Sequence, residues 1–117
     1  MDKTKEREIS ILLLELGFQP HLAGYKYMRS AVEMVLLSPS LLQGKITKEI
    51  YPGVAAIHQT TASRVERAMR HSIDQAHEKK THKWNRLIGH YHHSPEPPCN
   101  GFFLAQCVEV LRLELAS

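Results

Sequence analysis

The chain has 117 residues, of which 43% are hydrophobic and 23% are charged. This length and composition fit one globular domain and exclude a disordered chain. Apolar runs such as residues 11–14 and 35–37 are too short to cross a bilayer, and the charged N-terminus lacks the apolar core of a signal peptide. We therefore expect a cytoplasmic protein that does not associate with membranes. Its two cysteines, Cys99 and Cys107, do not make a disulfide framework.

The net charge of +3 is unevenly distributed along the chain. Residues 58–86 hold seven Lys or Arg against three acidic residues, together with four of the eight histidines. Residues 87–117 hold one Arg against three acidic residues. A local excess of positive charge is typical of a protein that binds nucleic-acid phosphates, and a solvated helix face is the alternative interpretation.

Apolar residues recur at helical spacing along most of the chain. Gly17 is expected to end the first helix, and Thr47 to be the N-cap of a short third helix that runs toward Tyr51. Pro52 suits the first turn of the next helix, and Thr60 and Thr61 suit the N-cap of the long helix that follows. No segment alternates with the period of a strand. The pattern predicts helices over residues 9–16, 25–36, 47–51, from 52 onward, 61–78, 84–91 and 104–115, with an extended Pro-rich connector over 94–98.

These elements predict an all-α domain of about six helices around one core. Residues 53–78 look like a helix-turn-helix, because a small residue, Ala55, lies ten positions before a β-branched residue, Val65. Such a spacing lets the second helix pack back on the first. In this motif the second helix enters the major groove of DNA.

The predicted long helix has two distinct faces when it is plotted at 100° per residue. Val65 and Met69 lie on an apolar stripe with Ala62, Ser72, Ile73 and Ala76. The opposite stripe is basic and polar. It holds Ser63, Arg64, Arg67, Arg70, His71 and Asp74.

Three arginines near a helix N-terminus suit major-groove binding, because a planar guanidinium is bidentate toward guanine. Glu66 on the flank is able to accept a hydrogen bond from the amino group of cytosine. The start of the helix, with Thr60, Thr61 and Ser63, suits phosphate binding. Three ordinary interpretations stay open: surface pairs Glu66–Arg70 and Arg70–Asp74, and a capping box made by Ser63 and Glu66.

Three segments carry a resemblance to a known family: residues 24–31 (Gly-Tyr-Lys-Tyr-Met-Arg-Ser-Ala), residues 46–52 (Ile-Thr-Lys-Glu-Ile-Tyr-Pro) and residues 60–71 (Thr-Thr-Ala-Ser-Arg-Val-Glu-Arg-Ala-Met-Arg-His). Leu-Arg-Leu-Glu at 111–114 fits as well. Over residues 8–115 the chain resembles the C-terminal effector domain of the stage-zero sporulation response regulator of endospore-forming bacteria. The resemblance implies a six-helix, sequence-specific DNA-binding transcriptional regulator, associated with the nucleoid, that needs no cofactor.

The resemblance implies that Arg64, Glu66 and Arg67 contact DNA bases. The phosphate contacts come from the neighbouring positions Thr60, Thr61, Ser63, Arg70 and His71. The partners implied are double-stranded DNA, a second copy placed head to tail on tandem sites, and RNA polymerase.

The chain departs from the family pattern in three places. The receiver domain of the full-length family member is absent from these 117 residues, so the whole chain is interpreted as one effector domain. His58 stands where the family has a large apolar residue, and we expect Ile57 to fill that space. Residues 77–101 differ strongly from the family.

Other chemistries have weaker support. His90, His92 and His93 cluster, but no Cys or carboxylate accompanies them at metal-ligand spacing, so we expect no metal site. No catalytic motif is present, and we expect no enzyme. The main alternative is a helical interaction protein of the same fold that docks to a regulatory partner without binding DNA.

Overall fold

The computed structural model describes residues 3–116, and within them every regular element is a helix and there are no strands. The α-helices are α1 (Lys3–Glu15), α2 (Ala23–Leu37), α3 (Tyr51–His58), α4 (Ala62–Lys79), α5 (His82–Trp84) and α6 (Asn100–Leu115). Three short turns connect them: a 3₁₀ turn at Pro39–Leu42 and π-helical turns at Ile46–Ile50 and Asn85–Gly89. The predicted all-α fold is confirmed.

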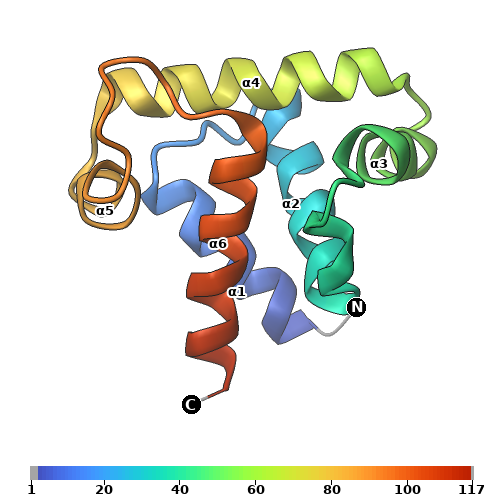
Figure 1. The fold of residues 1–117 in the computed structure, drawn as a ribbon, viewed down its shortest axis with the longest axis horizontal. Helices are drawn as coiled ribbons and strands as arrows, with labels where there is room; N and C mark the ends of the chain where they lie inside the picture. The colour runs from blue at the N-terminus through green and yellow to red at the C-terminus, as the bar shows by residue number, and fades with distance from the viewer. Residues whose placement is uncertain (1–2, 117) are drawn as a thin grey trace.

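The helix α4 lies across one side of the molecule, with α1, α2 and α6 on its inner side (Figure 1). The helices α3 and α5 lie near its two ends, and α6 starts beside α4 and runs away from it (Figure 1). The fold therefore places the predicted recognition helix at an outer edge.

Apolar residues at helical spacing build the core as expected. Three aromatic rings stack within it: the centroid of the Phe103 ring is 5.2 Å from that of Phe18 and 5.7 Å from that of Trp84. All three side chains are buried. Cys107 is buried as well, which raises the pKa of its thiol.

Several predicted helix boundaries are confirmed. Gly17 follows α1 with φ +103°, a left-handed conformation that favours glycine. Pro52 lies in the first turn of α3, where its missing N–H costs nothing. Thr61 is the N-cap of α4, because its hydroxyl oxygen accepts a hydrogen bond from the Arg64 N–H at 3.2 Å.

Other boundaries were predicted wrongly. The turn before α3 begins at Ile46 after Lys45, so Thr47 is not its N-cap. The turn continues into α3 without a break, because Ile50 and Tyr51 both have helical backbone angles. Cys99 caps α6 through its sulfur, and this helix starts four residues earlier than expected.

No helix within residues 3–116 has the length and apolar character that crossing a membrane requires.

Candidate nucleic-acid interface

The chain reverses sharply between α3 and α4. Gln59 adopts the left-handed conformation, with φ 55° and ψ 50°, and the N–H of Thr60 donates to the Ala55 carbonyl at 3.0 Å. Ala55 and Val65 are both buried, as the ten-residue spacing predicted. The two helices pack against each other and form the expected helix-turn-helix.

His58 anchors the first helix of this motif. Its Nε2 shares a 2.7 Å hydrogen bond with the Ser30 hydroxyl, and its ring meets the Tyr27 ring edge-on at 5.2 Å. The expectation that Ile57 fills this space is wrong, because Ile57 is 61% exposed. His58 is accommodated where the family has an apolar residue, because its ring packs on the Tyr27 ring and its Nε2 is hydrogen-bonded to the Ser30 hydroxyl.

The rotational phase predicted for α4 is confirmed. Val65, Met69, Ser72, Ile73 and Ala76 are buried. The opposite side is exposed. It presents Ser63, Arg64, Arg67, Arg70, His71 and Asp74 to solvent.

Two of the three candidate base-reading side chains have no hydrogen bond or ion pair in the described part of the chain. Within residues 3–116 the structure gives the guanidinium groups of Arg64 and Arg67 no hydrogen bond or ion pair. Glu66 is different, because its Oε2 lies 3.1 Å from Nε of Arg70. A carboxylate has about four acceptor positions, so Glu66 keeps capacity for a further donor.

We name Arg64, Glu66 and Arg67 the basic ridge, and the candidate phosphate-contacting residues flank it along the chain. Ser63 is exposed in the first turn of α4, and Thr60 is half-buried in the turn before it. The Gln75 side-chain amide is 3.3 Å from Nε2 of His71. Because the amide nitrogen donates, Nε2 accepts in this contact and the ring proton lies on Nδ1, for which the structure gives no partner within residues 3–116.

The pair Glu66–Arg70, expected as an ordinary surface interaction, is therefore present. Its side chains are 37% and 58% exposed, and a pair of this exposure adds little stability. The capping box of Ser63 and Glu66 is wrong, because Thr61 and not Ser63 is the N-cap.

A hollow of about 310 Å³ lies beside the ridge and is lined by Thr47, Tyr51, Ala62, Ser63, Glu66 and Arg67. Tyr51 receives a hydrogen bond from the side-chain amide of Asn100. Burial raises the pKa of Tyr51, while the Asn100 bond acts in the opposite direction. Sequence reasoning missed Asn100, since no periodicity links it to Tyr51, 49 positions away.

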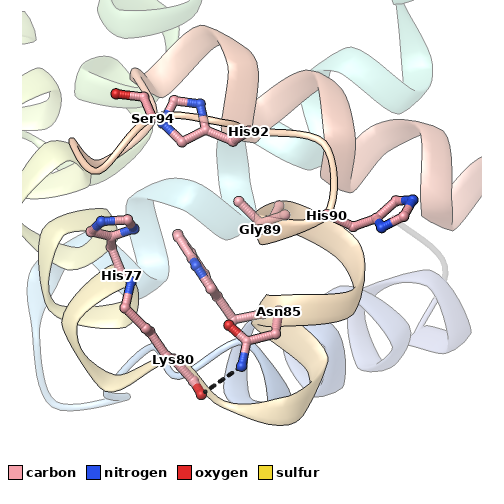
Figure 2. Close-up of a pocket in the computed structure, with 9 residues that line it drawn as sticks. His77, Lys80, Asn85, Gly89, His90, His92 and Ser94 are labelled. Atoms are coloured by element: carbon pink, nitrogen blue, oxygen red, sulfur yellow. Dashed lines mark hydrogen bonds between the residues drawn. The ribbon is translucent and has the colours of Figure 1, made fainter.

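The histidine-rich part of the chain lies at the other end of α4. Figure 2 shows a pocket of about 380 Å³ in which His77 and His92 are on one side and His90 points away. Nε2 of His77 donates to the Pro95 carbonyl at 3.0 Å, and Nε2 of His92 donates to the Glu96 carbonyl at 2.7 Å. Residues 3–116 contain no cluster of three potential metal ligands.

The comparison with known families agrees with this geometry. Residues 9–111 match the model of the family described as "Sporulation initiation factor Spo0A C terminal". The match spans α2 through α5 and most of α1 and α6, and it includes the whole helix-turn-helix. This family consists of DNA-binding domains of sporulation regulators and is not an enzyme family. The chain belongs to the Spo0A C-terminal family of DNA-binding transcription-factor domains.

Proposed function

We propose that residues 1–117 act as one effector domain, a sequence-specific transcriptional regulator that reads the major groove with α4. One observation carries this proposal: the guanidinium groups of Arg64 and Arg67, which have no partner among residues 3–116, lie on the exposed side of a helix whose other face is buried. Arginine is the most common side chain in specific contacts to guanine. A helix at the outer edge of the fold has the access to a groove that such contacts need (Figure 1).

The proposed roles follow from the position of each side chain. Arg64, Arg67 and Glu66 contact base edges, where Glu66 shares its carboxylate between Arg70 and a cytosine amino group. The residues around them hold phosphates and fix the register of α4 on the duplex. These are Thr60, Thr61, Ser63, Arg70 and His71.

Further partners belong to the same proposal. A second copy binds an adjacent site head to tail, RNA polymerase is the machinery that responds, and the protein works on the nucleoid in the cytoplasm. None of these requires a cofactor.

Selection of binding sites from a random duplex pool tests the proposal directly. We expect one short sequence to be enriched, and its affinity to fall steeply with salt while its preference over scrambled DNA stays large. A helical protein that only docks to a partner would show neither enrichment nor a salt-dependent affinity for DNA. That result would overturn the proposal.

Two substitutions separate base reading from phosphate binding. Arg67→Ala should cost about 1–3 kcal/mol of discrimination at one base pair. Arg70→Ala should weaken binding to all sequences alike and reduce the salt slope by about one. Arg112→Ala is the matched control, because Arg112 has the same 58% side-chain exposure as Arg70 and also pairs with a glutamate on its own helix, α6.

A further inference from the structure

Asn100 is a buried polar residue that touches the recognition helix from behind. It is the first residue of α6 and is only 7% exposed. Its side-chain Nδ2 donates to the Tyr51 hydroxyl at 3.0 Å and to the backbone carbonyl of Glu66 at 3.2 Å. Both hydrogens of the amide are therefore used, on partners from two other elements.

The carbonyl that Asn100 holds belongs to the peptide bond between Glu66 and Arg67, the two neighbouring residues to which we assign base contacts. Inside an α-helix this carbonyl already accepts from the N–H four residues later. The second lone pair of the carbonyl oxygen accepts the hydrogen bond from Asn100. The contact therefore fixes the backbone of α4 at the point where two base-reading side chains leave it.

Tyr51 is the third residue of this hydrogen-bonded group, with Asn100 and Glu66. It is the first residue of α3 and is buried, and its side chain lines the hollow beside Glu66 and Arg67. Asn100 thus ties the starts of α3 and α6 to the second turn of α4. Its own Oδ1 is buried and has no partner within residues 3–116, so donated hydrogen bonds alone hold the amide.

We propose that Asn100 is a positioning residue for base recognition, which sets the Glu66–Arg67 peptide against α3 and α6. This inference rests on the proposed function. Bidentate contacts to base edges require a well-defined direction of the guanidinium, whereas phosphate contacts act mainly through charge. Loss of the amide therefore lowers sequence discrimination and leaves general DNA binding nearly unchanged.

The test uses Asn100→Leu, which keeps the size of the side chain and removes its donors. Three duplexes serve as probes. The first is the duplex recovered by selection, and the second differs from it at one base pair, the one at which Arg67→Ala no longer discriminates. The third is a scrambled duplex. We expect the ratio of the first two dissociation constants to fall about fivefold, the size expected for one lost hydrogen bond. Affinity for the scrambled duplex should change less than about twofold.

Gln106→Leu is the matched control on the same helix. The Gln106 amide also donates to a backbone carbonyl, that of Leu87 at 3.1 Å, and within residues 3–116 the structure gives it no hydrogen bond to α4. This variant should keep the full discrimination ratio. An equal loss in Gln106→Leu would show that any disturbance of α6 has the same effect, and would overturn the proposal.

Partial unfolding does not hide the result, because unfolded protein changes both dissociation constants equally and leaves their ratio unchanged. Tyr51→Phe gives a second reading, since it removes one acceptor without adding bulk. Its loss of discrimination should be smaller, and non-additive with that of Asn100→Leu. Enrichment of a sequence with an unchanged ratio in Asn100→Leu overturns this inference alone, whereas absence of any enrichment overturns the proposed function with it.

Discussion

At Gly24 the helices α2 and α4 approach so closely that no side chain fits between them. A Cβ atom at this position would overlap the Ser72 hydroxyl and the Ala68 carbonyl of α4. Gly24 is also the first residue of one of the segments that carry the family resemblance. The position of the basic ridge on the molecule therefore depends on a residue that has no side chain.

Gly24→Ala should destabilise the fold by about 2 kcal/mol, because overpacking at a backbone contact forces the two helices apart. A loss of stability would be informative, because replacing Gly by Ala inside a helix normally raises the free energy of unfolding. Chemical denaturation measures the effect. Gly89→Ala is the control, because a Cβ there would meet no atom closer than 3.7 Å. Equal stabilities of the two variants would contradict the close approach.

Gln59 is a second position where the backbone sets the requirement. Its left-handed conformation ends α3 and is strained for any residue with a Cβ. Gln59→Gly should therefore stabilise the protein by about 0.5–1 kcal/mol. Ala56→Gly, on the exposed side of α3, should instead destabilise it by about 1 kcal/mol. Urea denaturation of both variants checks these opposite signs.

The contact that His58 makes between two helices depends on pH. His58 joins α3 to α2, and its pKa is lowered by burial and by the positive charges of Lys26 and Arg29. The folded chain therefore holds this proton less tightly than the unfolded chain, whose histidine has the ordinary pKa of 6.5. The stability that His58 contributes is present above pH 6.5 and is lost as the pH falls through the lowered pKa.

His58→Leu should remove this part of the pH dependence, because leucine does not titrate. The free energy of unfolding, measured from about pH 8 to pH 5, should decline more steeply in the original chain than in the variant. The other seven histidines are common to both proteins and cancel in the difference. If the two plots of unfolding free energy against pH were parallel, protonation of His58 would not destabilise the fold, and the prediction would be wrong.

Local patterns predicted what depends on neighbours in the sequence. Helical periodicity gave the buried face of α4, and i,i+4 spacing gave the pair of Glu66 and Arg70. Contacts between distant residues were out of reach. Asn100 and Tyr51 meet only because α6 starts beside α3 and α4, and the anchoring of His58 depends on Ser30 in α2.

Helix ends were less predictable than helix faces, for a physical reason. A cap is one hydrogen bond, and several residue types provide it. Thr61 was recognisable as a cap, but Thr81, which caps α5, also donates to the Glu15 carbonyl at 2.7 Å, and that contact appears only in the fold. Cys99 caps α6 with a sulfur, which propensities for oxygen-bearing caps do not anticipate.

Charge is unevenly distributed between α4 and α6. The basic segment 58–86 includes α4, whereas α6, which runs away from α4, carries Glu109 and Glu114 against one arginine, Arg112. An electric field of this kind turns the basic side toward DNA during approach and accelerates association at low salt. The basic surface of a single molecule is short, because Asp74 and Glu78 follow His71 on the exposed side of α4.

A short surface predicts weak binding by one copy and strong binding by two. Two chains joined by a flexible linker should bind a duplex with two selected sites about 10²–10⁴-fold more tightly than a duplex with one, because the second contact becomes intramolecular. Titration of both duplexes at one salt concentration measures this gain. The control is a linked pair in which one copy carries Arg67→Ala and Arg70→Ala, and it should lose most of the gain. If the intact pair binds both duplexes equally, one copy already supplies the full affinity, and tandem sites are not required for recognition.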